Sequence, residues 1–192
     1  MKRIAVFGGS FNPVHYGHIG VARRVMEENL ADEVWLMVSP RNPLKEQSGL
    51  LDERIRLDLV RLAVADVPGV VACDFEFALP RPSYSWQTLA ALTRTYPEAS
   101  FSLVIGSDNW LLFPKWAHYE EILDRYSLIV YPRPGFPVRA SSLPDNVRLL
   151  DAPLFPWSST DIRNRLRQGG DVSDMVPPSV AERLRNLPFF QE

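Results

Sequence analysis

Residues 8–18 read Gly8-Gly9-Ser10-Phe11-Asn12-Pro13-Val14-His15-Tyr16-Gly17-His18, and they directly follow a strand-like segment at 3–7. When a strand breaks into glycines and a helix then begins, the first N–H groups of the helix lack intrahelical partners. Together with the positive end of the helix dipole, they form a pocket that suits anions. His15 and His18 stand three positions apart beside this pocket, and imidazoles can carry charge near neutral pH. The stretch therefore indicates chemistry on a phosphate.

The histidine pair also has two plainer interpretations. It can cap a surface helix, or it can belong to a metal site, although no carboxylate or cysteine lies near it in sequence to complete such a site. The first turn has no Gly-x-Gly-x-x-Gly fingerprint of a dinucleotide site, and the chain has no P-loop lysine motif. Because the glycine pocket adjoins both histidines, we favour the phosphate interpretation and predict no metal held by protein ligands.

At 192 residues, with 46% hydrophobic and 23% charged residues, the chain has the composition of one ordinary globular domain. Its net charge of −2 gives no overall field that would favour nucleic acid or an anionic membrane. The early strand leaves no room for a signal peptide, and no apolar run approaches transmembrane length. The single cysteine, Cys73, excludes an internal disulfide, and the alternation at 71–77 predicts a small core residue there. We expect a reduced, cytoplasmic protein.

Strand-like and helix-like segments alternate along the chain. We expect strands at 3–7, 33–38, 70–75, 101–105, 126–131 and 147–150, and helices that include 51–62, 85–96, a segment from a capping box at 158–161 to Gly169, and 178–187. In the segment 51–62, a shared apolar face opposite arginines and acids is formed by Leu51, Ile55, Leu59 and Leu62. The alternation predicts an α/β fold: a Rossmann-like, doubly wound, mostly parallel sheet with helices on both faces. One domain would span 1–192, with a short C-terminal helical part at about 158–192.

In such open sheets, ligands bind beyond the carboxyl ends of the strands. The segments that follow the predicted strands include 8–15, 39–45, 106–110, 132–135 and 157–163, and they are rich in basic, hydroxyl-bearing and glycine residues. These residues would gather along one edge of the sheet. Their clustering strengthens the prediction of a nucleotide site.

Several motifs together carry a family resemblance. The stretch 8–18 resembles the signature of the HxGH nucleotidyltransferase superfamily, and 158–163 resembles its second signature. The segments 82–89, 105–108, 113–116 and 133–135 are similar to those of the bacterial nicotinate-nucleotide adenylyltransferases. The resemblance spans nearly the whole chain in the right order. It has two departures: Asn12 replaces a common Asp but keeps a turn-forming side chain, and Ser85 replaces a common Thr but keeps the hydroxyl and the N-cap role.

The resemblance implies an enzyme that transfers the adenylyl group of ATP to nicotinate mononucleotide, giving deamido-NAD and pyrophosphate in NAD biosynthesis. It implies catalytic roles for His15, His18 and Arg163. It implies ATP binding by Gly8, Gly9, Ser10, Phe11, Gly106, Asp108, Arg133, Ser159 and Thr160, and mononucleotide binding by Lys45, Ser85 and Trp116. Mg²⁺ would accompany ATP, held chiefly through water rather than in a protein cage.

Plainer interpretations stay open for the less certain positions. Lys45 can be a solvated loop charge, Asp108 a turn former, Trp116 a core residue and Arg133 a surface residue. For the whole chain, the rival functions are adenylyl transfer to nicotinamide mononucleotide or to phosphopantetheine, and a nucleotide-binding regulator without catalysis. The sequence leaves open whether the chain forms a homo-oligomer.

Overall fold

The computed structural model describes residues 1–40 and 49–190. The strands form one sheet in the order β3-β2-β1-β4-β5-β6, and every pair of neighbours is parallel. The strands are β1 (Lys2–Gly9), β2 (Glu33–Val38), β3 (Val70–Cys73), β4 (Ala99–Gly106), β5 (Ser127–Tyr131) and β6 (Val147–Leu149). This is the doubly wound order of the Rossmann-like fold predicted from the alternation.

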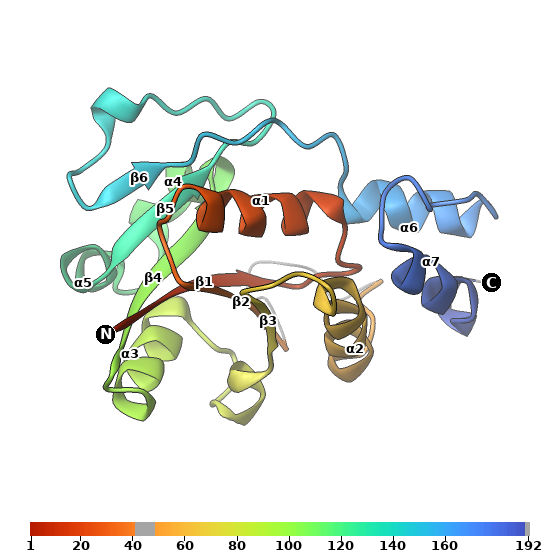
Figure 1. Cartoon of the computed structure of the whole chain (residues 1–192), viewed down its shortest axis with the longest axis horizontal. Coiled ribbons are helices and arrows are strands. Elements are labelled where there is room, and N and C mark those ends of the chain that lie inside the picture. Colours follow the sequence, from red (N-terminus) through yellow and green to blue (C-terminus); the bar gives the residue numbers. More distant parts are fainter. Residues whose placement is uncertain (41–48, 191–192) are drawn as a thin grey trace.

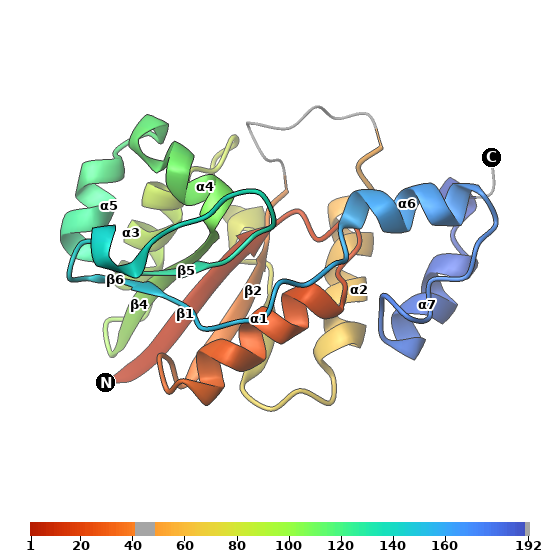
Figure 2. The ribbon, with the colours of Figure 1, turned by 90° about the horizontal axis from the view of Figure 1, so that it is seen from above.

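The helices alternate with the strands and then continue beyond β6 (Figures 1 and 2). They are α1 (Tyr16–Glu27), α2 (Glu53–Val64), α3 (Ser85–Thr95), α4 (Ser107–Leu112), α5 (Tyr119–Arg125), α6 (Ser159–Arg167) and α7 (Pro178–Arg185). Short 3-10 helices cover Phe75–Ala78, Phe113–Lys115, Ala140–Ser142 and Pro188–Phe190. Both views place α6 and α7 together at the opposite end of the molecule from α3 and α5.

The two faces of the sheet support two separate hydrophobic cores. Because side chains alternate along a strand, Ala5 and Phe7 of β1 join a cluster with buried residues of α1, α2, α6 and α7. Ile4 and Val6 face the other way and join a cluster with buried residues of α3 and α5. Helices therefore cover both faces, as predicted.

The strand order reverses at β1, which lies between β2 and β4. At this point the crossovers leave in opposite directions, and open sheets of this kind bind ligands in the crevice beyond the carboxyl ends of the strands on either side, here β1 and β4. Gly9 closes β1, and its carbonyl accepts a 2.9 Å hydrogen bond from the Ser39 N–H just after β2. The stretch 8–18 therefore begins at the edge of the sheet where ligands bind in this fold.

The prediction for 70–75 is wrong at its end. β3 stops at Cys73, and Phe75–Ala78 turns into a 3-10 helix. The turn places the buried carboxylate of Glu76 where it accepts hydrogen bonds from the Ser83 hydroxyl at 2.9 Å and the Thr88 hydroxyl at 2.8 Å. Cys73 is half-buried and packs against the second core, which agrees with its predicted packing role.

The predicted apolar face of α2 is also wrong in part. Leu62 is 39% exposed, whereas Arg56, predicted to lie on the solvent face, is fully buried. The residues that α2 buries include Leu59, Val60 and Ala63, because the helix packs against β3, β2 and α7.

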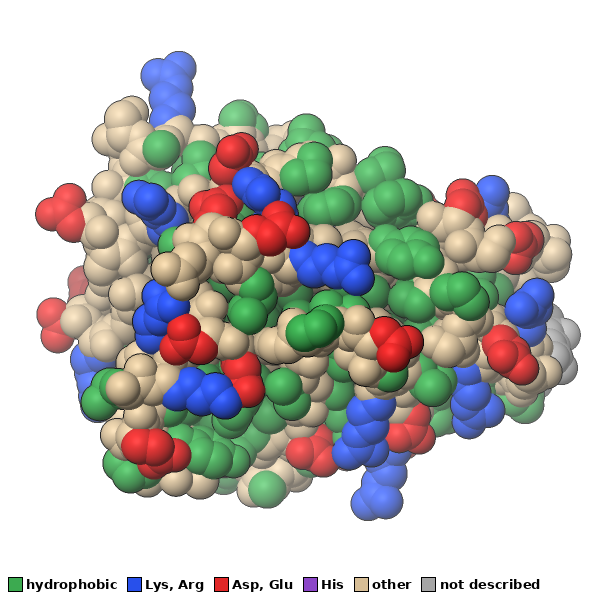
Figure 3. Space-filling view, in the orientation of Figure 1, with side chains coloured by type: hydrophobic (Ala, Val, Ile, Leu, Met, Phe, Trp, Pro, Cys, Tyr) green, Lys and Arg blue, Asp and Glu red, His purple; other side chains and the backbone are tan. Residues whose placement is uncertain are grey.

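The surface carries both signs of charge. Acidic and basic side chains are interspersed over the face shown in Figure 3, in keeping with the small net charge. Among the described residues, no helix has the length and apolar character needed to cross a membrane.

Candidate active site

The loop after β1 is held by its own side chains and by α6. Phe11 has a φ of +45°, a left-handed conformation that is uncommon for a non-glycine residue and turns the chain sharply. The buried Asn12 amide donates to the Gly49 carbonyl at 2.8 Å and accepts from the Leu51 N–H at 3.0 Å. Both ends of this side chain are therefore used to fix the loop against the segment that precedes α2.

The two predicted histidines lie side by side at the start of α1. Their ring centroids are 3.8 Å apart. His15 is the N-cap residue, and its Nδ1 accepts the Gly17 N–H at 3.1 Å, while Nδ1 of His18 accepts the His15 N–H at 3.2 Å. Because both Nδ1 atoms are acceptors, each ring presents Nε2–H as a donor. A Cβ at Gly17 would lie 2.9 Å from the His15 ring, so only glycine admits this cap.

Charge on His15 is disfavoured. Burial first, and then the positive charge of Arg133, lower its pKa to about 4, while Asp161 acts in the opposite direction. At neutral pH His15 is thus an uncharged hydrogen-bond donor. The general ability of imidazoles to carry charge near neutral pH is therefore not realised at His15.

The start of α6 closes one side of the loop. Ser158 is the N-cap residue and accepts the Asp161 N–H at 3.1 Å, which gives one half of the predicted capping box. The Ser159 hydroxyl donates to the Pro13 carbonyl at 2.9 Å, and Arg163 donates to the Asn12 carbonyl at 2.8 Å. The second predicted motif therefore meets the first, although about 150 residues separate them in sequence.

Arg163 also reaches its own helix. Its guanidinium donates to the Thr160 hydroxyl at 3.2 Å. Burial lowers the pKa of Arg163, and the neighbouring charge of Arg167 adds to this effect. The guanidinium nevertheless stays charged at neutral pH, because the ordinary pKa of an arginine lies far above neutrality.

The ends of β4 and β5 form the other side of the crevice. Ser107 accepts the Arg133 N–H through its hydroxyl at 2.9 Å, and the Arg133 guanidinium lies 3.7 Å from the Asp108 carboxylate. A Cβ at Gly106 would lie 2.4 Å from Asp108 Oδ1 and 2.7 Å from Arg133 Cδ, so this close approach requires glycine. The described residues provide no hydrogen-bond partner for the buried atom Asp108 Oδ1.

Phe7 connects the two sides. Its ring contacts His18 at 5.9 Å, Phe11 at 5.8 Å and Tyr131 at 5.4 Å between centroids. Burial raises the pKa of Tyr131, and its hydroxyl interacts with Arg133. The predicted phosphate residues thus lie on one side of this aromatic contact, and Asp108 and Arg133, predicted separately as ATP-binding residues, lie on the other.

Two of the predicted mononucleotide residues lie further along the same edge. Ser85 is the first residue of α3, but Tyr84 is its N-cap, which corrects the N-cap role predicted for Ser85. Trp116 follows the 3-10 helix at Phe113–Lys115, packs on Phe113 at 5.4 Å, and within the described structure has a buried Nε1 without a hydrogen bond. Lys45 lies outside the described residues.

The rings of Trp86 and His118 pack on each other, with centroids 4.2 Å apart and planes tilted by 36°. Trp86 follows Ser85 directly, and His118 stands two residues after Trp116, so this contact brings the two segments together.

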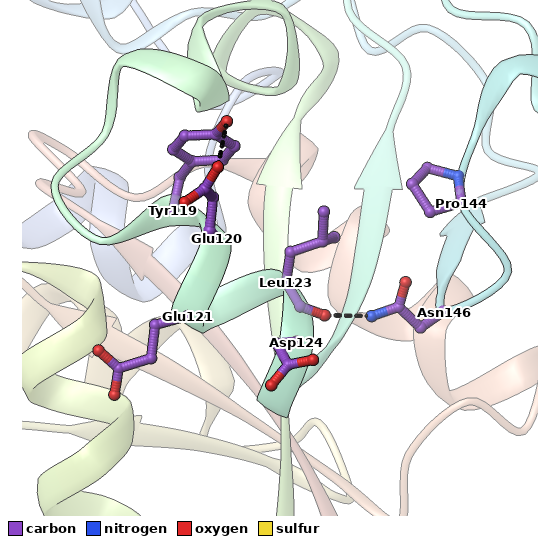
Figure 4. A pocket seen from close by; sticks show the side chains of 7 residues that line it. All are labelled: Tyr119, Glu120, Glu121, Leu123, Asp124, Pro144 and Asn146. Atoms are coloured by element: carbon purple, nitrogen blue, oxygen red, sulfur yellow. Dashed lines mark hydrogen bonds between the residues drawn. The ribbon is translucent and has the colours of Figure 1, made fainter.

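A separate pocket lies beside α5 (Figure 4). Its lining includes Glu120, Glu121 and Asp124, and the Asn146 amide donates to the Leu123 carbonyl across it. None of the predicted site residues lines this pocket, and its carboxylates would repel phosphates. It is therefore a surface hollow apart from the candidate site.

Sequence reasoning missed one buried cation next to the site. Arg56 is 0% exposed and donates to the carbonyls of Ser10 and Ser39, which follow β1 and β2. The helical spacing of Arg56 from Leu59, Val60 and Ala63 is the signal that could have revealed it.

Known proteins resemble this chain over most of its length. Residues 6–165 match the model of the cytidylyltransferase-like family. A protein of Bacteroides thetaiotaomicron named "Probable nicotinate-nucleotide adenylyltransferase" is 49% identical over 183 residues, covering 95% of this chain and 91% of its own. One of the same name from Bacteroides fragilis is 47% identical, covering 95% and 90%.

The chain belongs to the nicotinate-nucleotide adenylyltransferase family of cytidylyltransferase-like enzymes. The family resemblance carried by the motifs is thereby confirmed. The fold agrees as well: the solved Plasmodium falciparum nicotinic acid mononucleotide adenylyltransferase complexed with NaAD superimposes with a TM-score of 0.81. It covers 100% of this chain and 98% of its own, and at 19% identity the likeness shows the fold alone.

Proposed function

We propose that this chain transfers the adenylyl group of ATP to nicotinate mononucleotide, releasing pyrophosphate and forming deamido-NAD in the cytoplasm. The observation that carries the proposal is the pair of His15 and His18 rings, 3.8 Å apart at the start of α1, beside a loop that Ser159 and Arg163 hold in place. The identity of the two substrates is inferred from the family to which the chain belongs.

The chemistry needs charge stabilisation more than a base. A phosphate monoester has a second pKa of about 6, so the attacking phosphate of the mononucleotide is largely ionised at pH 7. It attacks the α-phosphorus of ATP in line with the leaving pyrophosphate. Neutral His15 suits this role, because a group with a pKa of about 4 is a poor base at pH 7 but keeps its N–H donor.

The residues after β1 and at the start of α6 bind the phosphates. His18 with the Ser10 and Phe11 amides contacts the α-phosphate, and His15 holds the phosphates from the other side. Arg163 with the N-terminus of α6 at Ser159 and Thr160 holds the β- and γ-phosphates of the leaving group. Gly8 and Gly9 keep the backbone close to the phosphates.

The nucleoside and pyridine parts are bound further along the sheet edge. Asp108 accepts hydrogen bonds from ribose hydroxyls, and its buried unpaired Oδ1 supports this assignment. Gly106 leaves room for it, and Arg133 flanks the adenine or the phosphates. Trp116 stacks on the pyridine ring, and backbone N–H groups around Ser85 recognise its carboxylate.

Mg²⁺ enters with ATP in this proposal. The described residues contain no group of three or more His, Cys, Asp or Glu side chains arranged to hold a metal. We expect the ion to be coordinated chiefly by phosphate oxygens and water. When bound, the ion would neutralise charge on the phosphates.

The deciding experiment measures pyrophosphate release from ATP with each acceptor in turn: nicotinate mononucleotide, nicotinamide mononucleotide and phosphopantetheine. We expect release with nicotinate mononucleotide to exceed the other two at least tenfold. A preference for either other acceptor would replace the proposed substrate. No release with any of them would favour a binding protein without catalysis.

A further inference from the structure

Arg56 is a buried cation with an unusual set of partners. It lies near the start of α2, is 0% exposed, and its guanidinium makes hydrogen bonds to four backbone carbonyls. These belong to Leu51 at 2.9 Å, Ser10 at 2.6 Å, Ser39 at 2.8 Å and Pro40 at 3.1 Å. A buried charge satisfied by carbonyl dipoles keeps its net charge, because no carboxylate neutralises it.

The nearest acidic residues on α2 do not pair with it. Among the described residues, Glu53 forms its ion pair with Arg81 at 2.7 Å, and the Asp52 carboxylate accepts the Arg54 N–H at 2.8 Å. Glu53 and Asp52 therefore act on the charge of Arg56 only through space, and its direct partners are the four carbonyls. This charge lies just beneath the loop that we assign to phosphate binding.

The hydrogen bond from Arg56 to the Ser10 carbonyl fixes the direction of the Phe11 N–H. The carbonyl of Ser10 and the N–H of Phe11 belong to one trans peptide group, so they point in opposite directions. Because Arg56 binds this carbonyl, the Phe11 N–H points away from Arg56. No group in the described structure accepts a hydrogen bond from this N–H.

We propose that Arg56 is a positioning residue: it holds the Phe11 N–H toward the α-phosphate of ATP and polarises that peptide group so that the N–H becomes a stronger donor. The bonds to Ser39 and Pro40 serve the same end, since they fix the end of β2 against the end of β1. This inference rests on the proposed adenylyl transfer, but it concerns a residue that touches no substrate.

The test compares Arg56→Lys with Arg61→Lys, a matched change on the exposed side of the same helix, where Arg61 pairs with Asp58 at 3.2 Å. Lysine keeps the charge, but its three donors on one atom do not reproduce the planar fork of arginine. We expect Arg56→Lys to lower kcat about thirtyfold, since weakening one transition-state donor lies below the loss from removing it. KM for ATP should change less than threefold, and Arg61→Lys should match the wild type.

Three results would overturn the inference. These are an unchanged kcat in Arg56→Lys, a rise in KM for ATP as large as the fall in kcat, or a fall in kcat that is equalled by Arg61→Lys. The second would mean that Arg56 only maintains the shape of the site.

A measurement on the wild-type chain covers the case in which Arg56→Lys does not fold. The Phe11 amide proton, followed by NMR, should move downfield when a non-hydrolysable ATP analogue is added with Mg²⁺. An unmoved resonance under saturating analogue would refute the inference without reference to any variant. A wild-type chain that releases no pyrophosphate would refute the proposed function, while the amide shift would still show whether the Phe11 N–H meets the phosphate, on which the role of Arg56 depends.

Discussion

The two sides of the crevice differ in how many of their polar groups find hydrogen-bond partners within the protein. After β1, the loop is held by the Asn12 amide, by Ser159 and by Arg163 from α6, with hydrogen bonds between 2.8 and 3.0 Å. After β4 and β5, Asp108 Oδ1 is buried without a hydrogen bond, and the Arg133–Asp108 contact of 3.7 Å is too long to be one. The first side is fixed by hydrogen bonds within the protein, whereas the second has a buried carboxylate oxygen to offer a ligand.

This difference suggests a division of labour. Catalysis by charge stabilisation requires donors that do not reorganise during the reaction, and the satisfied loop after β1 provides such a frame. Recognition of a nucleoside or a pyridine ring can instead use buried groups that gain their partners on binding. A buried unpaired polar group costs about 1–3 kcal/mol, so a ligand that pairs it recovers a comparable amount.

Removing His18 should give the largest effect, because it deletes a transition-state donor from the preorganised side. We expect His18→Ala to lower kcat about a hundredfold or more, equivalent to roughly 3 kcal/mol, while KM for ATP changes far less. Steady-state pyrophosphate release measures both constants, and circular dichroism confirms that the fold is intact. Turnover near the wild-type level would break the assignment of catalysis to this side.

The second prediction concerns the pH dependence of stability. Burial lowers the pKa of His15 to about 4 in the folded chain, whereas the unfolded chain has a value near 6.5. Between these values the unfolded state binds the proton more readily, so this contribution to stability is present above pH 6.5 and is lost as the pH falls toward 4. The loss amounts to about 3 kcal/mol at most.

His15→Asn is the matched variant for this test, because asparagine can cap α1 but does not titrate. Urea unfolding at pH 7, 5.5 and 4.5 should show that the wild type loses more stability than the variant as the pH falls. Parallel losses in the two proteins would mean that His15 titrates normally in the fold.

The same contrast explains what the sequence could and could not foretell. The sheet, the helix faces and the two motifs at 8–18 and 158–163 follow from local periodicity and turn chemistry, which a single sequence displays. The long-range bonds do not follow, since nothing local indicates that Asn12 reaches Gly49 or that Arg163 reaches the Asn12 carbonyl. Family resemblance named the residues of the site, but their mutual geometry required the fold.

Two local errors have a similar origin. The prediction of a strand through 70–75 failed because the buried Glu76 finds hydroxyl partners in Ser83 and Thr88, which lie 7 and 12 residues further along the chain, outside the strand-like segment. Arg56 was placed on the solvent face because charge alone suggested exposure, whereas four backbone carbonyls make its burial tolerable. In both cases tertiary partners overrode a local preference.

Asn12→Asp tests whether the loop after β1 depends on its internal bonds. Aspartate keeps the acceptor for Leu51 but loses the N–H that Gly49 accepts at 2.8 Å, and it sets a carboxylate against that carbonyl. We expect a loss of about 2 kcal/mol in the free energy of unfolding, which corresponds to a fall in Tm of roughly 4–8 °C.

Asn186→Asp is the control, because its amide donates to the Glu182 carbonyl at 3.1 Å on the exposed surface. For this variant we expect the free energy of unfolding to change by no more than about 0.5 kcal/mol. Equal changes in Tm for the two variants would show that the bond to Gly49 contributes no more than a surface contact. The fixed position of the loop after β1 would then need an explanation other than this hydrogen bond.

The smallest expected effect concerns the side that a ligand completes. Trp116→Ala should raise KM for nicotinate mononucleotide about tenfold, while KM for ATP changes less than threefold, because a flat ring is lost from the proposed pyridine site. Trp116→Phe keeps a flat ring but lacks Nε1, so its KM should lie between those of the wild type and Trp116→Ala. Trp110→Phe, in the neighbouring stack on Phe113, is the control and should leave both constants unchanged. A parallel rise in both KM values, or a lowered Tm with normal KM values, would make Trp116 a packing residue and leave Asp108 as the main unsatisfied group on that side.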